Sequence, residues 1–235
     1  MNTYEKHANL YSAWVAILVP TTLIAYSLYV MLQFKCRDFL LIKGVLSTIL
    51  PVVFFSACGY YLRELFRDTS KILFQFQLFK EDETEMPTTK LLLYKSRLMD
   101  RADLSLVRRR VKEDFSYRMP SEKDEDKDLL SAKIGIASAV SKIREVTRSN
   151  MILLQANYRY GFYRNMLGGI VWAVLPILVI IGLGYGLPNK RIIMAGWVSF
   201  SVLMLQFVLS LLFMKYAAWT YARYLIAAYL TRDNK

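Results

Sequence analysis

A long apolar run from Met166 to Leu187 is the feature that most restricts how this chain can fold, because Tyr185 is its only ionisable residue. A helix of about 20 apolar residues is enough to cross a hydrocarbon core of about 30 Å. Immediately before this run, Arg159 and Arg164 alternate with aromatic residues, a pattern typical of the boundary between a membrane and water. The run therefore predicts a transmembrane helix, and its start predicts the junction between a polar region and a membrane region.

Three further apolar runs predict three more spans, at Ala13–Leu32, Phe39–Leu62 and Ile192–Met214. The first run lacks the basic start and the small-residue cleavage site of a signal peptide, so we interpret it as a span. Gly168 and Gly169 near the start of the third run predict that a neighbouring helix approaches closely there.

The four runs indicate an all-α membrane protein with four transmembrane helices in two hairpins and a helical cytoplasmic insert. We expect residues 1–62 to form the first hairpin, 63–165 the cytoplasmic helical domain, and 166–235 the second hairpin with an amphipathic C-terminal tail. The net charge of +12 is compatible with anionic lipid, with nucleic acid or with an orientation signal. Basic residues flank the polar sides of the second and third runs more heavily than the opposite links, which favours a cytoplasmic middle region and cytoplasmic termini.

The middle region holds 21 Lys and Arg residues against 16 Asp and Glu residues and is expected to be helical with two breaks. Apolar residues at three-to-four spacing predict one continuous helix from Leu129 to Tyr158, and one or two helices within 91–117. The acidic runs KEDETE and SEKDEDKD are expected to be solvated connections. In the second of these, Ser121 and Asp124 are spaced as in a capping box.

No set of residues in the sequence indicates catalysis. His7 is the single histidine, so a Ser/His/Asp triad would depend on it, and most metal chemistry is excluded. The glycine-rich stretch GLGYG lies within the third apolar run and lacks the lysine that follows a phosphate-binding loop. We therefore expect neither enzyme activity nor a metal or cofactor.

Polar residues inside the apolar runs are the candidates for lining a pore. Serine and threonine can instead bond to the backbone of their own helix. A glutamine amide in hydrocarbon needs a partner, so Gln206 either joins helices or lines a water-filled path, and the sequence leaves both open. The candidate pore-lining residues are Thr48, Ser199, Gln206 and Ser210.

Basic residues on the cytoplasmic helices form two groups suited to binding phosphates. The alternative is a solvated surface that only sets the orientation in the membrane. Arg144 and Arg148 are expected one turn apart on the same helix face. The candidate ligand-binding residues are Arg108, Arg109, Arg110 and Lys112 in the first group, and Lys133, Lys142, Arg144 and Arg148 in the second.

Two segments, RELFRDTSKILFQFQLFKEDETEMPTT (63–89) and IREVTRSNMILLQANYRYGFYRNMLGG (143–169), together with the four-span layout, carry a resemblance to a known family. The chain resembles the small membrane effectors of bacterial anti-phage defence, of the kind found in the Hailong system. The resemblance implies a homo-tetrameric ion channel in the bacterial inner membrane. It also implies a nucleotidyltransferase-like partner protein, whose oligonucleotide product holds the channel closed until infection.

A second class of function stays open at this point. The alternative is a non-conducting membrane anchor that recruits a soluble partner through its cytoplasmic helices, and a small transporter is a third option. Four spans without a buried charge do not favour a proton-coupled transporter. Ion conduction in liposomes distinguishes the channel from the anchor.

Overall fold

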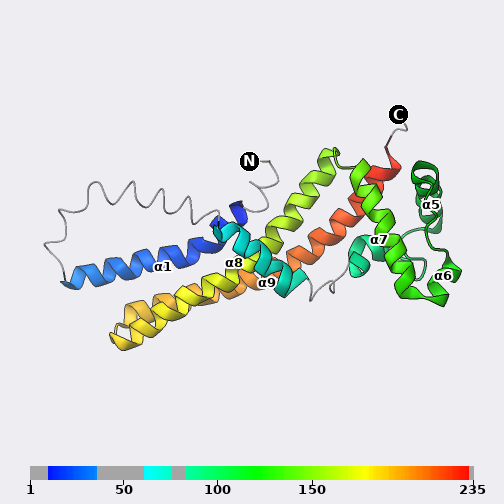
Figure 1. Cartoon of the computed structure of the whole chain (residues 1–235). Coiled ribbons are helices and arrows are strands. Elements are labelled where there is room, and N and C mark those ends of the chain that lie inside the picture. Colours follow the sequence, from blue (N-terminus) through cyan, green and yellow to red (C-terminus); the bar gives the residue numbers. More distant parts are fainter. Residues whose placement is uncertain (1–9, 36–60, 76–82, 233–235) are drawn as a thin grey trace. The chain divides into compact units, whose positions relative to one another are not determined.

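The computed structural model describes residues 10–35, 61–75 and 83–232, and every regular element within these ranges is helical (Figure 1). The all-α fold class is therefore confirmed. Two helices, α8 (Met151–Gly186) and α9 (Lys190–Leu230), are long and apolar enough to cross a membrane. The first predicted span falls in α1 (Tyr11–Lys35). Most of the second predicted span, and with it Thr48, lies outside the described residues.

The chain divides into two compact units. The first comprises Met1–Phe74 and Gly161–Leu212, and the second comprises Gln75–Tyr160 and Phe213–Lys235. The boundary after Tyr160 falls inside α8, and the boundary after Leu212 falls inside α9. The predicted amphipathic tail, which begins at Lys215, thus groups with the second unit, which we call the polar unit.

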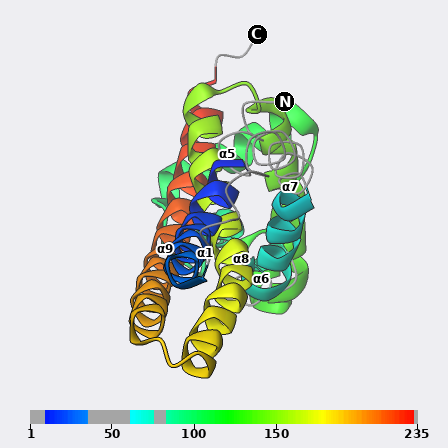
Figure 2. The same ribbon diagram turned by 90° about the vertical axis from the view of Figure 1, so that its left-hand side faces the viewer.

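The first unit contains α1, a helix over residues 61–70 that continues into the π-helical η2 (Lys71–Gln75), and the apolar parts of α8 and α9. Figure 2 shows α8 (yellow) and α9 (orange) side by side and joined by a short turn. Asn189 ends this turn and caps α9, since its side-chain oxygen accepts a hydrogen bond from the Arg191 amide at 3.1 Å. Ile170, Ile177 and Leu203 are almost fully buried between the helices of this unit.

Many other apolar side chains of the α8–α9 hairpin are exposed. An exposed apolar surface of this extent is unstable in water but is the normal outer surface of a helix in lipid. The exposed side chains include Leu175, Val179, Leu183, Met194, Val198, Val202, Leu205 and Leu209.

Two glycines of α8 allow other helices to pack against its backbone. A Cβ atom at Gly168 would lie 1.9 Å from the carbonyl oxygen of Phe66, and one at Gly169 would lie 2.5 Å from the Cβ of Ala16. Neither distance is compatible with a side chain. The prediction that a neighbouring helix approaches closely at these glycines is confirmed.

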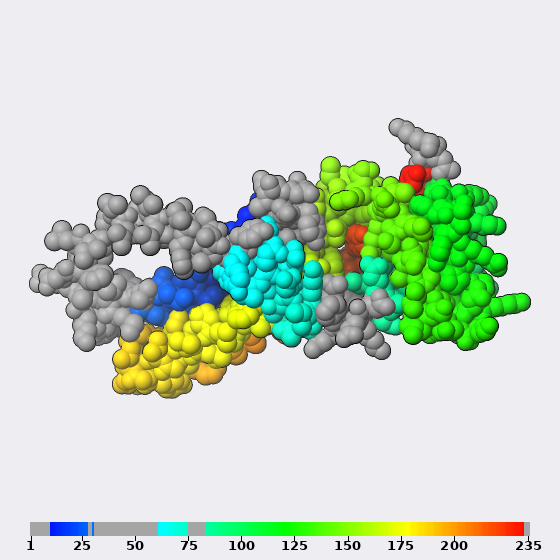
Figure 3. Space-filling view, in the orientation of Figure 1, coloured from blue at the N-terminus to red at the C-terminus, as the bar shows by residue number. Residues whose placement is uncertain are grey.

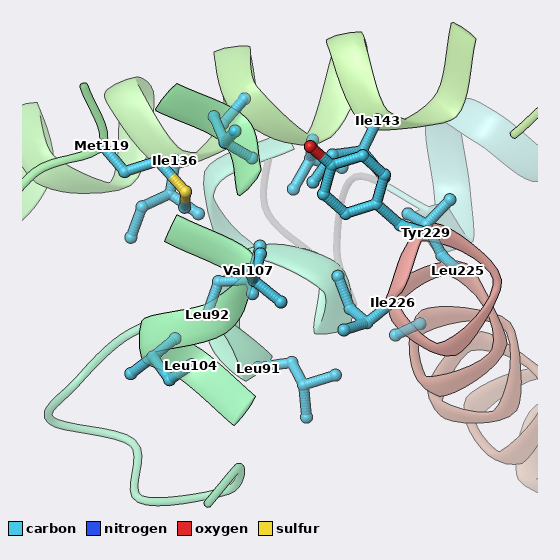
Figure 4. Close-up of a cluster of buried hydrophobic side chains, with 14 of the residues drawn as sticks. Leu91, Leu92, Leu104, Val107, Met119, Ile136, Ile143, Leu225, Ile226 and Tyr229 are labelled. Atoms are coloured by element: carbon cyan, nitrogen blue, oxygen red, sulfur yellow. The ribbon is translucent and has the colours of Figure 1, made fainter. Parts of the chain in front are cut away.

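The second unit contains η3 (Glu83–Glu85), α4 (Pro87–Leu91), α5 (Arg101–Phe115), α6 (Glu122–Lys127), α7 (Leu129–Val146) and the adjoining ends of α8 and α9. Figure 4 shows how apolar side chains from α4, α5, α7 and the end of α9 point toward one another. Val107, Ile136, Ile143 and Leu225 are all completely buried in this core. The last helical turns of α9 therefore belong to a well-packed core.

Side-chain caps fix where the helices of the second unit begin. Asp100 accepts a hydrogen bond from the Ala102 amide at 3.1 Å, and Asp128 accepts one from the Leu130 amide at 3.0 Å. Ser121 and Asp124 form the predicted capping box, which is confirmed, although the run SEKDEDKD that we expected to be a loop contains the helix α6. Hydrogen bonds from Ser121 hold the pKa of Asp124 below its usual value.

The continuous helix predicted from Leu129 to Tyr158 is wrong. Helix α7 ends at Val146, residues 147–150 form a turn, and α8 begins at Met151. The Thr147 hydroxyl donates to the Ile143 carbonyl oxygen at 2.7 Å, and the Asn150 side chain accepts from the Leu153 amide at 3.1 Å. Thr147 ends α7 and Asn150 caps α8, so the helix is interrupted even though the apolar spacing continues across these residues.

Candidate functional site

Arg108 belongs to a buried network rather than to an open basic surface. Glu125 of α6 is completely buried and accepts hydrogen bonds from the amides of Tyr94, at 3.0 Å, and Lys95, at 3.1 Å. The guanidinium of Arg108 lies 3.5 Å from this carboxylate and 4.1 Å from the centre of the Tyr94 ring. It also donates to the carbonyl oxygens of Leu92, at 3.0 Å, and of Pro120.

This network corrects the expectation that the carboxylates of SEKDEDKD are all solvated. Burial lowers the pKa of Arg108, whereas the adjacent Glu125 carboxylate favours its charged form. Two backbone amides and an arginine surround Glu125, so the pair holds α5, α6 and the segment around Tyr94 together. The Arg108 side chain is only 10% exposed, and its guanidinium already has these partners.

Arg110 holds the C-terminal end of α9. Its guanidinium donates to the carbonyl oxygens of Tyr229 at 2.8 Å and Leu230 at 2.6 Å. These carbonyls have no partner within their own helix, and a cation beside them also stabilises the helix dipole. The Tyr229 hydroxyl donates to Asp114 of α5 at 3.0 Å. Burial and the Asp114 carboxylate raise the pKa of Tyr229.

Lys133 and Arg144 pair with the acidic segment Glu83–Glu85, which we call the acidic clasp. Glu83 lies 2.7 Å from Arg144, and Glu85 pairs with Lys133 and also, at 3.0 Å, with Lys90. These pairs correct the expectation that KEDETE is only a solvated connection. The hydrogen bond from Lys133 is the main reason why the pKa of Glu85 is lowered.

The other four predicted ligand-binding residues have exposed side chains on the second unit. Figure 3 shows one face of this unit, most of it in green. Arg109 and Lys112 lie on α5, where Arg109 makes only an exposed pair with Glu113 at 3.8 Å. Lys142 of α7 lies about 6 Å from the rings of Phe115 and Tyr117. Arg148 lies in the turn after α7, so the expectation that it shares a helix face with Arg144 is wrong.

Two of the three predicted pore-lining residues of α9 make hydrogen bonds to other residues of the protein. The Gln206 amide donates to the Met166 sulfur of α8 at 3.4 Å, so within one chain it joins two helices. Ser210 is completely buried and donates to the Gln206 carbonyl oxygen at 2.6 Å, and Ser199 is half-buried. Of the predicted pore-lining residues that the structure describes, only Ser199 keeps a half-exposed polar group without a bond to another residue.

A group of cations that the sequence analysis treated only as an orientation signal comes together in the first unit. Arg63, Arg67 and Lys71 are spaced four residues apart and therefore lie on one face of their helix. This helix crosses α8 at Gly168, which brings the Ser70 hydroxyl within 3.5 Å of the Asn165 side-chain oxygen and places Arg164 beside Lys71. The four-residue spacing was visible in the sequence, but the position of Arg164 beside it was not.

Comparison of this chain with known protein families, with curated proteins and with solved structures finds no match. Within residues 10–35, 61–75 and 83–232, no group of three or more His, Cys, Asp or Glu residues is placed to hold a metal ion.

The acidic clasp should contribute stability that depends on pH. Because the folded-state pKa of Glu85 is lowered, its contribution is present above the unfolded-state value of about 4.3 and is lost as the pH falls through the folded-state value. We expect Glu85→Gln to lower the free energy of unfolding by about 1 kcal/mol at neutral pH, and by progressively less below pH ~4. Glu145→Gln, at an exposed position of α7, is the matched control. A loss that stays constant as the pH falls, or an equal loss in the control, would contradict the account; denaturant unfolding at several pH values measures both.

Proposed function

We propose that this chain is a membrane effector of bacterial anti-phage defence. It forms a homo-oligomeric, tetrameric channel that depolarises the inner membrane on infection and is controlled by an oligonucleotide from a partner nucleotidyltransferase. The observation that carries the proposal is the length of α8 and α9, 36 and 41 residues. Each exceeds the ~20 residues needed to cross a bilayer, and each continues as an unbroken helix into residues of the polar unit.

The exposed cations of α5 are the part of the polar unit best placed to connect a ligand with the membrane helices. Arg109 and Lys112 are exposed, and Arg110 on the same helix holds the end of α9. An oligonucleotide bound along α5 would thus act next to the contact that holds α9. It can shift a closed–open equilibrium only if it binds the closed state more tightly. The turn at 147–150 makes α7 a less direct route, because α7 does not continue into α8.

The channel would form between copies of the chain. Within one chain, Gln206 and Ser210 already have partners, so residues 10–35, 61–75 and 83–232 offer few free polar groups to line a path through a single copy. The exposed faces of α8 and α9 are available to lipid or to neighbouring copies, and on α9 Ser199 is half-buried and Ser201 is exposed. In this proposal the middle region and the termini are cytoplasmic, so a reporter fused after Lys127 should be inside the cell and one at Asn189 outside.

The alternative function is a non-conducting membrane anchor. The internal bonds of Gln206 and Ser210 favour it, because they satisfy these groups without water. An anchor would insert in the same orientation and present the same polar unit to a soluble partner. It would pass no ions, and this difference separates the two functions.

Binding of the oligonucleotide can be tested by its dependence on salt. A single-stranded DNA octamer should bind the protein with an affinity that falls as salt rises, with a slope of about −0.7 for each phosphate contact. We expect Arg109→Ala with Lys112→Ala to weaken binding about 25-fold or more and to reduce that slope. Arg148→Ala tests the other exposed group, and Arg144→Glu with Arg148→Glu tests whether α7 contributes. Binding that is insensitive to salt, or unchanged in all of these variants, would contradict an oligonucleotide site on the basic helices.

A further inference from the structure

Several basic side chains lie where the helix over residues 61–70 crosses α8. Glu64 pairs with Arg63 at 2.8 Å and with Arg67 at 2.9 Å, and Asp68 lies 3.4 Å from Arg67. Lys71 lies on the same helix face as Arg63 and Arg67, and Arg164, whose Nε donates to the Asn165 side-chain oxygen at 3.2 Å, lies beside it. Lys71 has no ion pair or hydrogen bond from its side chain to any residue that the structure describes.

The crowding of like charges affects Lys71 directly. Partial burial lowers its pKa, and the neighbouring charges of Arg67 and Arg164 lower it further. Asp68 and Glu64 offset only part of this effect. An anion bound beside Lys71 would relieve the repulsion and restore a balanced set of charges.

Arg164 is the cation of this group that lies on α8, and its place in the sequence predicts the depth of lipid headgroups. Arg164 lies two residues before the apolar run that starts at Met166, a separation of about 3 Å along a helix axis. Six residues into the apolar run, the Trp172 indole donates to the Thr69 hydroxyl of the helix that leads to Lys71, at 2.9 Å. Tryptophan is enriched at the boundary between hydrocarbon and headgroups, where its ring is in an apolar environment and its N–H has a polar partner.

We propose that Arg67, Lys71 and Arg164 form a binding site for the phosphate headgroup of an anionic phospholipid in the cytoplasmic leaflet. The cations come from two helices that meet at Gly168, so one headgroup can contact both helices. Lipid phosphates are present at this depth at a high local concentration, whereas a soluble phosphate ligand is not concentrated there. Basic sites between helices on the cytoplasmic side suit such headgroups. The site goes beyond the proposed channel function, since an anchor and a channel would bind the lipid equally.

The test compares lipids on the full-length protein in detergent by native mass spectrometry. Phosphatidylglycerol should bind at least tenfold more tightly than phosphatidylcholine. Lys71→Ala should weaken phosphatidylglycerol binding about fivefold, and Lys71→Ala with Arg164→Ala more strongly. Lys123→Ala, at an exposed lysine of α6, should leave binding unchanged. Because Lys71 makes no bond within the described residues, its removal should not affect folding, which the thermal unfolding midpoint checks.

Three outcomes would overturn the site. The first is equal binding of the two lipids, and the second is wild-type affinity in Lys71→Ala. The third is displacement of the lipid by millimolar inorganic phosphate, which would assign the cations to a soluble anion instead. All three measurements are independent of ion conduction, so a protein that does not conduct can still pass or fail them.

Discussion

Glu125→Ala is expected to lower the free energy of unfolding of the polar unit by about 3–5 kcal/mol. The substitution leaves the buried Arg108 guanidinium without its carboxylate, and removing one member of a buried ion pair costs about this much. It also leaves the amides of Tyr94 and Lys95 without their acceptor. Hydrogen exchange followed by mass spectrometry on the full chain should show the loss as faster exchange in α5, α6 and α7.

Glu122→Ala on the same helix is the matched control. Glu122 makes an exposed pair with Arg101 at 3.3 Å, and such pairs contribute about 0–1 kcal/mol. A second variant, Glu125→Ala with Arg108→Met, removes both charges and should recover part of the loss. If Glu125→Ala changes exchange no more than Glu122→Ala does, the buried network does not hold the unit together.

Gly168→Val is expected to destabilise the first unit by about 3 kcal/mol or more. Its Cβ would lie 1.9 Å from the Phe66 carbonyl oxygen and 2.9 Å from the Ser70 amide nitrogen. Both are backbone atoms, so no side-chain rotation relieves the clash, and one helix must move away from the other. Loss of this crossing should also separate Lys71 from Arg164 and weaken binding of phosphatidylglycerol.

Gly182→Ala in the same helix is the control, because a Cβ there meets nothing within 4 Å. Alanine favours a helix over glycine by about 1 kcal/mol, so this substitution should leave stability unchanged or raise it. Thermal unfolding in detergent compares the two variants. Equal midpoints would contradict the close crossing at Gly168.

The features that the sequence predicted correctly are local ones. The helical class follows from apolar spacing, the capping box from Ser121 and Asp124, and the close approach of helices from two adjacent glycines. Each of these depends on residues a few positions apart. The burial of one face at the end of α9 could also have been predicted, because Ala222, Leu225, Ile226 and Tyr229 have helical spacing. All four are buried.

The roles of the charged residues depended on partners far away in the sequence. Glu125 is 31 residues from Tyr94, and Glu83 is 61 residues from Arg144. No periodicity indicates which arginine of a cluster will be buried. The turn at 147–150 was also missed, because Thr147 and Asn150 stop one helix and start another without a proline or glycine.

Ion flux through liposomes that contain only this protein is the most direct test of the central claim. The account predicts that a membrane potential imposed across protein-containing liposomes collapses faster than across empty ones, and that a single-stranded oligonucleotide slows the collapse. Arg109→Ala with Lys112→Ala should conduct but resist the oligonucleotide. Insertion is checked with protease, which should cut a site placed after Asn189 from one side of the membrane only. If the inserted protein lets the potential hold as it does in empty liposomes, the chain is an anchor and the channel proposal is wrong.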